Sequence, residues 1–88
     1  MKLLFDKTFN KDISELKDKK IASSLKEIIN EFEKKESILE ITGIKKIKGY
    51  KSYYRKRIGD YRIGFKYENN EILFVRVKHR KDIYKLFP

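Results

Sequence analysis

Four arginines and one tyrosine in the second half of the chain are the residues best suited to chemistry. They fall in two short stretches and are Arg55, Arg57, Arg62, Arg80 and Tyr84. A guanidinium group keeps its charge, and its fork of N–H donors matches the oxygens of a phosphate. Such a cluster can stabilise the negative charge that develops on a phosphodiester when the bond is cleaved.

Cleavage of RNA by attack of its own 2′-hydroxyl also needs one group that takes a proton and one that gives a proton. Arginine does not lose its proton in proteins and is a poor candidate. His79 is the only histidine, and histidine titrates near neutral pH, whereas Tyr84, Lys56 and Lys81 are further candidates. The chain has no cysteine, which excludes thiol catalysis, and no carboxylate cluster suited to magnesium is visible. We therefore expect neither a metal nor another cofactor, and the proton-transfer groups stay open.

The net charge points to the same kind of ligand. The chain of 88 residues has a formal net charge of +10, and nucleic acid is the commonest partner of so basic a chain. Lysine-rich composition alone would scatter its charges over the surface. The position of the charges on the predicted elements therefore decides between the two interpretations.

The first half of the chain has the pattern of a scaffold. Lys2 to Phe5 predicts a short strand, Thr8 is a candidate N-cap of a first helix, and Asp18 is a candidate N-cap of a second helix. The second helix has a wide apolar stripe formed by Ile21, Leu25, Ile28, Ile29 and Phe32. We expect the two helices to form a hairpin that covers one side of a sheet.

The second half predicts that sheet. Three segments have the pattern of strands, and they are Tyr53 to Ile58, Tyr61 to Tyr67 and Ile72 to Lys78. Gly59-Asp60 and Asn69-Asn70 are two-residue hairpin turns, the second a weaker signal. Ser37 to Gly49 is expected to be irregular, and the tail from Asp82 to Phe87 could be strand or helix. The prediction is a single α+β domain over residues 1–88, with an N-terminal strand, a two-helix hairpin and a three-stranded antiparallel meander forming one sheet with the helices on one face.

A two-residue turn at Gly59-Asp60 fixes the register of the first hairpin. Arg57 then faces Arg62, and Arg55 faces Gly64. The core face carries Tyr54, Ile58, Tyr61, Ile63, Phe65 and Tyr67, with Lys56 as the one charged exception. The basic face carries Tyr53, Arg55, Arg57, Arg62 and Lys66 around Gly64. Arginines directly opposite each other repel unless an anion lies between them, and Gly64 could let a ligand approach the backbone closely.

The third strand of the meander is apolar on both faces, as expected for a central strand. Its register stays open, because a bulge near the Asn-Asn turn would shift it. The end of this strand lies beside the start of the second strand in an antiparallel meander. We therefore expect Arg80 and Tyr84 to fall near Arg62.

Two segments resemble a known family. The run from Tyr54 to Ile63 resembles the central hairpin of the RelE/ParE toxin superfamily, and the run from Val77 to Tyr84 resembles its final motif of a valine, a glycine, His-Arg and a tyrosine. The resemblance covers nearly the whole chain and is strongest to archaeal RelE-type members. The chain departs from the pattern at Lys78, which replaces the usual glycine, and in the short spacing from Arg80 to Tyr84.

The resemblance implies a ribosome-dependent endoribonuclease that cuts mRNA in the decoding site without a metal. The catalytic residues that it implies, matched by motif position, are Arg55, Arg57, Arg62, Arg80 and Tyr84. The RNA-binding residues that we expect beside them are Lys46, Lys48, Lys56, His79 and Lys81. The resemblance also implies a cognate RelB-like antitoxin, which we expect to be a short chain with an acidic helical segment that blocks the basic site.

Two other functions are open at this point. A gyrase-poisoning toxin of the ParE branch would share the fold, but it usually lacks the full basic and tyrosine set. A non-catalytic relic that binds RNA or an antitoxin would keep the fold and lose the activity. The apolar run at the N-terminus stops after Phe5, too short for a signal peptide or a membrane span, so we expect no membrane association and a cytoplasmic location.

Overall fold

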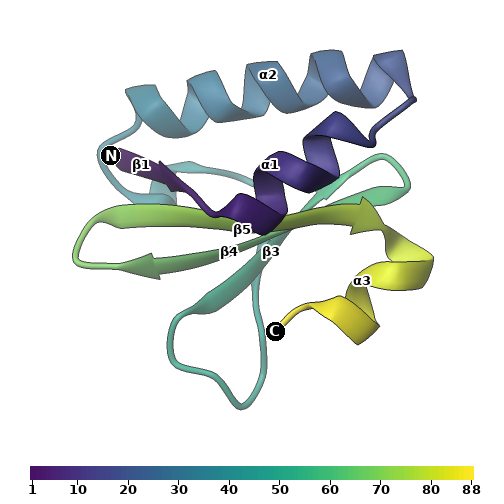
Figure 1. Cartoon of the computed structure of the whole chain (residues 1–88). Helices are drawn as coiled ribbons and strands as arrows, with labels where there is room; N and C mark the ends of the chain where they lie inside the picture. The colour runs from purple at the N-terminus through teal and green to yellow at the C-terminus, as the bar shows by residue number, and fades with distance from the viewer.

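A five-stranded sheet with the order β1-β5-β4-β3-β2 forms the centre of the computed structural model, which describes residues 1–88. The strands are β1 (Lys2–Phe5), β2 (Ile44–Lys46), β3 (Tyr53–Ile58), β4 (Tyr61–Glu68) and β5 (Glu71–His79). The helices are α1 (Lys7–Ser14), α2 (Lys19–Lys34) and α3 (Arg80–Leu86), with a 3₁₀ turn η1 (Ile38–Glu40). β1 pairs parallel with β5, and the other neighbours are antiparallel. The helices α1 and α2 lie on one side of the sheet and α3 on the other (Figure 1).

The predicted α+β class is therefore confirmed, with two additions. The segment expected to be irregular contains β2, which pairs with β3 at the edge of the sheet. The tail that could be strand or helix is the helix α3, and it lies on the face of the sheet opposite α2 (Figure 1).

Of the two predicted helix N-caps, one is confirmed and one is wrong. Asp18 caps α2, because its carboxylate accepts the backbone N–H groups of Lys20 and Ile21. The prediction that Thr8 caps α1 is wrong. Asp6 is the cap, and it accepts both the backbone N–H and the hydroxyl of Thr8. A carboxylate two residues earlier satisfies the free N–H groups of the first turn better than the Thr8 hydroxyl can.

A buried carboxylate fixes α1 to the edge of the sheet. Asp12 accepts the backbone N–H of Val77 at 3.1 Å, in the part of β5 that β1 does not reach. It also binds Arg76 through two N–H groups, at 2.8 and 3.1 Å, and lies 3.3 Å from the Lys78 ammonium. These two cations of β5 are therefore used to hold the scaffold.

Phenylalanines form the centre of the core between the helices and the sheet. The ring of Phe32 on α2 meets Phe65 edge-on at 5.4 Å and lies 5.4 Å from Phe74. The register of β5 shifts between Gly64 and Phe65, because Gly64 pairs with Arg76 whereas Phe65 pairs with Phe74. This bulge brings Val77 onto the core face with Ile72 and Phe74, while Leu73 and Val75 lie with Leu86 and Phe87 of the tail.

Candidate functional site

The hairpin of β3 and β4 has the register that its turn predicts. Arg57 lies opposite Arg62, and Arg55 lies opposite Gly64. Ile58, Ile63 and Phe65 are buried on the side of α2, which confirms the core face. The arginines lie on the opposite side of the sheet, where α3 also packs.

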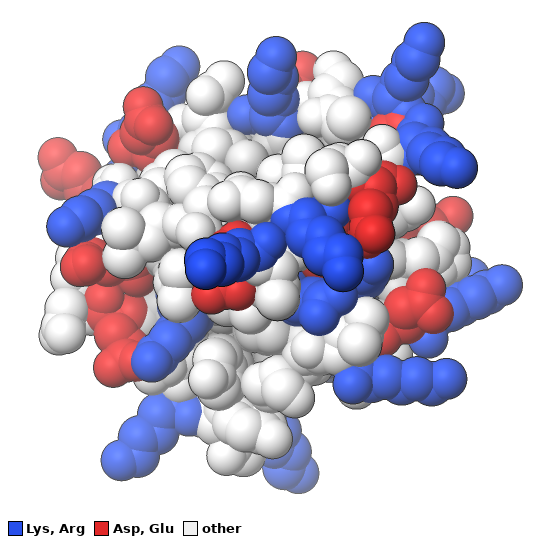
Figure 2. Space-filling view, viewed as in Figure 1, with Lys and Arg blue, Asp and Glu red and all other residues white.

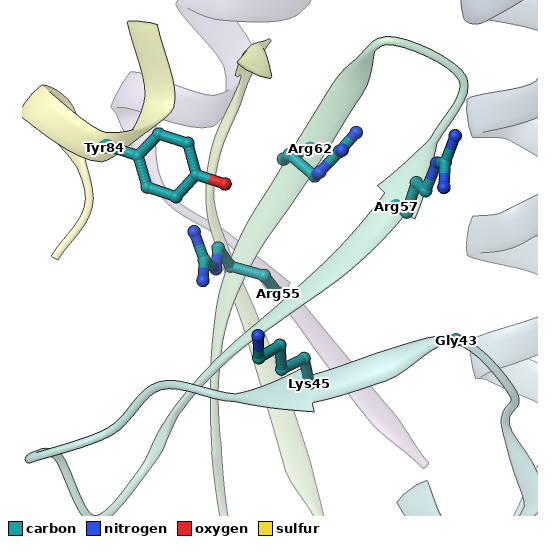
Figure 3. Close-up of a pocket in the computed structure, with 6 residues that line it drawn as sticks. All are labelled: Gly43, Lys45, Arg55, Arg57, Arg62 and Tyr84. Atoms are coloured by element: carbon teal, nitrogen blue, oxygen red, sulfur yellow. The ribbon is translucent and has the colours of Figure 1, made fainter. Parts of the chain in front are cut away.

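The arginines of this face line a cavity of about 340 Å³ together with residues from two other elements. Its lining residues are Gly43, Lys45, Arg55, Arg57, Arg62 and Tyr84. Figure 3 shows Tyr84 reaching in from α3 toward Arg55, with Lys45 of β2 on the other side of Arg55. The predicted approach of the tail to the hairpin is therefore correct for Tyr84.

The four cations of the cavity have no carboxylate partner. All ion pairs of the protein involve other cations, namely Lys66, Arg76 and Lys78. On the side of the molecule that Figure 2 shows, blue and red side chains are mixed, whereas every charged side chain of the cavity is positive. Four unpaired cations around one hollow create a strongly positive potential, which favours a polyanion.

Backbone carbonyls hold Arg62 in place. Its Nη1 donates to the carbonyl oxygens of Gly59 at 3.0 Å and Tyr61 at 2.8 Å. These bonds use one nitrogen of the guanidinium, so the other N–H donors are free for a ligand.

The ring of Tyr84 lies over the guanidinium of Arg55, with 4.7 Å between the Arg55 Cζ and the ring centroid. This distance is that of a cation–π contact. Tyr84 is nevertheless 65% exposed, so a large part of its ring is free to contact a ligand.

Two buried side chains of the tail position α3 and so place Tyr84. Ile83 and Phe87 are both buried, and the Phe87 ring fills the space above Gly64. A Cβ atom at Gly64 would lie only 2.5 Å from that ring. The expectation that Gly64 admits a ligand is therefore wrong, because the chain's own Phe87 occupies this space.

Three predicted residues next to the cavity do not line it. The backbone N–H of Arg80 donates to the Asp60 carbonyl at 2.8 Å, which fixes the start of α3 beside the hairpin turn, while its side chain is exposed. His79 pairs with Tyr61 of the core face, and its Nδ1 accepts the backbone N–H of Lys81 at 3.2 Å. His79 thus caps α3, and Lys81 is exposed in the first turn of that helix.

The lysines divide differently from the prediction. Lys56 is 8% exposed on the core face and donates to the Thr42 carbonyl at 2.6 Å, and it does not line the cavity. Lys46 donates to the Tyr50 carbonyl at 2.6 Å, and Lys48 is exposed in the loop after β2. Lys45 is the lysine that lines the cavity, because it pairs with Arg55 across β2 and β3.

The sequence pattern alone does not single out Lys45, because a strand of three residues gives too short a pattern to recognise. Once β2 is placed antiparallel to β3, the alternation of side chains puts Lys45 on the face of Arg55. The lysines before Tyr53 are visible in the sequence, but their faces can be assigned only when β3 is known to be the pairing partner of this segment.

Lys66 limits the basic face at the far end of β4. Its ammonium lies 2.9 Å from the Glu68 carboxylate, and this hydrogen-bonded pair raises the pKa of Lys66 and lowers that of Glu68. The unpaired charge is therefore concentrated at the end of the hairpin that carries Arg57 and Arg62.

The fold is that of a known class of small toxins. Residues 3–84 match the family of the ParE toxin of type II toxin–antitoxin systems, parDE. The chain therefore belongs to the RelE/ParE toxins of type II toxin–antitoxin systems, as its hairpin and its final motif indicate.

The similarity to one archaeal toxin extends over the full length. Toxin RelE3 of Methanocaldococcus jannaschii is 47% identical over 89 residues, which is 100% of both chains. A crystal structure of the RelB-RelE antitoxin–toxin complex from Methanococcus jannaschii contains a chain that is 46% identical, with a TM-score of 0.83 over 97% of this chain and 99% of that one.

More distant structures share the fold. The YoeB dimer from Staphylococcus aureus is 19% identical, with a TM-score of 0.70 over 90% of this chain and 95% of that one. The intact RelBE complex of E. coli contains a chain that is 18% identical, with a TM-score of 0.69 over 89% of this chain and 94% of that one. None of the helices of the present protein has the length and apolar character needed to cross a membrane.

Proposed function

We propose that this toxin is a ribosome-dependent endoribonuclease that cleaves mRNA and thereby stops translation in the cytoplasm. The cavity is the observation that carries the proposal. It brings Arg55, Arg57 and Arg62 together with Lys45, without any carboxylate, and places the exposed ring of Tyr84 at its side. A cavity of this kind fits a phosphodiester with an adjoining base.

The reaction begins with attack of the 2′-hydroxyl on the adjacent phosphorus. The P–O5′ bond breaks, and the products are a 2′,3′-cyclic phosphate and a free 5′-hydroxyl. Negative charge builds up on the phosphorus oxygens in the transition state, and Arg57 and Arg62 are placed to stabilise it from the two strands. The cavity lining contains no metal ligand of the carboxylate or imidazole type, so we assign this stabilisation to arginine alone.

Tyr84 has two roles open to it. Its ring can stack on a base beside the scissile phosphate, and its hydroxyl can exchange a proton with the attacking or the leaving oxygen. Arg80 and Lys81, at the exposed start of α3, are proposed as further contacts to the RNA backbone, together with Lys46 and Lys48 in front of β3. We assign no RNA contact to Lys56, because it is buried on the other face, or to His79, because it caps α3.

A gyrase-directed activity is the main alternative. The family that matches bears the ParE name, whereas the full-length relative is named as a RelE toxin. The joint presence of Arg55, Arg62 and Tyr84 in one cavity favours the nuclease, because a toxin that binds gyrase has no need of an unpaired arginine cluster with an aromatic ring beside it.

A RelB-like antitoxin is the proposed partner of the toxin. Similar toxins have been solved as complexes with RelB from Methanococcus jannaschii and from Pyrococcus horikoshii. We propose that an acidic helical segment of the antitoxin covers the cavity. The acidic side chains would neutralise the four unpaired cations of the cavity. Because salt screens such charge pairs, the affinity of the complex should fall as the salt concentration rises.

Expression of the toxin without its antitoxin tests the proposal. We expect growth arrest with cleaved mRNA on ribosomes, and we expect Arg62→Ala to be folded and harmless. Intact mRNA together with DNA damage would instead identify the gyrase activity. A folded toxin that changes neither mRNA nor DNA would identify a non-catalytic relic.

A further inference from the structure

The loop of residues 47–52 between β2 and β3 lies on the side of the sheet that carries the basic face. Figure 1 shows this loop and α3 on the same side of the sheet, away from α2. The loop is held by its own hydrogen bonds, since Ile47 donates its N–H to Tyr53 at 2.9 Å and Lys46 donates to the Tyr50 carbonyl at 2.6 Å. Gly49 makes the bend with a φ of +89°. The loop therefore presents Tyr50 in a defined position.

The loop carries one exposed aromatic ring, that of Tyr50. Tyr50 is 46% exposed, and its ring meets that of Tyr53 edge-on at 5.4 Å. Tyr53 in turn meets Phe87 edge-on at 5.4 Å, so Tyr50 rests on a row of packed rings. The contact with Tyr53 holds the Tyr50 ring in place and leaves part of the ring exposed to solvent.

This ring lies close to the proposed cleavage site. Tyr53 and Arg55 are two residues apart on the same face of β3, a spacing of ~7 Å along a strand. Tyr50 lies next to Tyr53 on the side away from Arg57. An RNA strand that places its scissile phosphate between Arg57 and Arg62 and continues past Arg55 would thus bring a nucleotide farther along the strand to Tyr50.

The charge around Tyr50 suits such a strand. No acidic residue occurs between Glu40 and Asp60, and Lys48 and Lys51 on either side of Tyr50 are exposed. Neither lysine belongs to an ion pair. Aromatic rings between unpaired cations are the usual means by which proteins hold single-stranded RNA without strong sequence preference.

We propose that Tyr50 is the stacking platform of a second RNA subsite, which binds the base of a nucleotide a few positions away from the scissile one, with Lys48 and Lys51 at its phosphates. This proposal rests on the proposed function, because it takes the cavity as the place of the scissile phosphate. It adds a contact that would set how tightly the mRNA is held, without a part in the chemical step.

Base stacking can be measured directly on the purified toxin. The probe is a short single-stranded RNA with uniform 2′-O-methyl groups, which cannot supply the attacking hydroxyl, and with one 2-aminopurine whose position is varied along the strand. We expect the fluorescence of 2-aminopurine to be quenched at a position a few nucleotides away from the one that responds to Tyr84→Ala. Tyr50→Ala should remove that quenching and weaken binding about 5- to 150-fold, and Tyr50→Phe should keep both.

Controls separate this subsite from the proposed function. Leu39→Ala removes a side chain that is 91% exposed outside the loop, and it should change neither binding nor quenching. If Arg57→Ala abolishes RNA binding whereas Tyr50→Ala leaves binding and every quenching position unchanged, the second subsite is wrong and the cavity stands. If Tyr50→Ala weakens only the complex with the antitoxin, the surface serves a protein partner and the subsite is again wrong. Absence of RNA binding by the wild-type toxin, with or without ribosomes, would overturn both proposals.

Discussion

Arg57 and Arg62 lie directly opposite each other on β3 and β4, and no carboxylate is paired with either of them. Like charges in this position destabilise a sheet, by an amount on the order of 0.2–1 kcal/mol. The carbonyl groups that bind Arg62 hold it in place in spite of this repulsion. The pair is therefore a strained arrangement that an anion between the two strands would relieve.

This arrangement predicts that inorganic phosphate stabilises the toxin. An anion that binds only the folded state at one hundred times its Kd adds about 2.7 kcal/mol to the free energy of unfolding. Thermal unfolding, followed by circular dichroism at constant ionic strength, should show a higher Tm with phosphate than with chloride. Arg62→Ala should lose the phosphate effect. An equal shift in both proteins would contradict an anion site at this pair.

Tyr84 gives a prediction that separates its ring from its hydroxyl. The ring packs over Arg55 at 4.7 Å and is mostly exposed, so Tyr84→Ala should weaken RNA binding about 5- to 150-fold. Tyr84→Phe keeps the ring and should bind RNA as wild type does. The rate of cleavage by Tyr84→Phe on ribosomes then measures the contribution of the hydroxyl. Equal loss of RNA affinity in both variants would contradict a stacking role.

Lys45 and Lys56 form a matched pair of lysines on opposite faces of the sheet. Lys45→Ala should weaken RNA binding and reduce the slope of the logarithm of affinity against the logarithm of salt concentration by ~0.7, the value for one phosphate of a single strand. Lys56→Met should leave affinity and slope unchanged, and it should cost about 1 kcal/mol of stability through the lost bond to Thr42. The reverse result, a loss of RNA binding in Lys56→Met alone, would show that the assignment of the two faces is wrong.

Asp6 predicts a dependence of stability on pH. The hydroxyl and the backbone N–H of Thr8 bind its carboxylate and lower its pKa below the usual 3.8. A lowered pKa in the folded state stabilises the fold above pH 3.8, and this contribution is lost as the pH falls through the folded-state value. Asp6→Ala should reduce stability by about 1 kcal/mol near neutral pH, through loss of the helix cap.

The matched control is Asp6→Asn, which can still cap the helix but does not titrate. The difference in unfolding free energy between wild type and Asp6→Ala should shrink as the pH is lowered below 3.8 and through the lower folded-state pKa, because the wild-type carboxylate becomes protonated. The stability of Asp6→Asn should change less with pH than that of wild type. A constant difference between wild type and Asp6→Ala over this range would show that Asp6 does not titrate in contact with Thr8.

The hairpin shows how much of the site could be predicted from the sequence. A two-residue turn leaves only one register, and alternation of side chains then assigns each residue of β3 and β4 to a face. Arg55, Arg57 and Arg62 can therefore be assigned to one face of the sheet from the sequence alone. The turn at Asn69-Asn70 also formed as expected, with positive φ values of 49° and 60°.

The features of the site outside this hairpin depend on contacts between segments that are distant in the sequence. The bulge that shifts β5 lies at Gly64, and a glycine within a strand indicates either a bulge or a close approach to the backbone, so the residue alone did not decide between them. Phe87 fills the space above Gly64 only because α3 turns back over the sheet. Lys56 was expected to bind RNA, but the alternation of side chains on β3 places it on the core face, where it donates a hydrogen bond to the Thr42 carbonyl. The alternation of side chains thus predicts which face of the sheet a residue lies on, but it does not predict which distant segment of the chain covers that face.

The most direct test of the nuclease assignment is to map the ends of mRNA in a purified translation system. We expect the wild-type toxin to cut ribosome-bound mRNA in the decoding site and to leave a 2′,3′-cyclic phosphate, without added metal beyond what the ribosome requires. The same mRNA without ribosomes should stay intact, and Arg62→Ala should not cut in either case. Intact ribosome-bound mRNA in the presence of folded wild-type toxin would contradict the assignment.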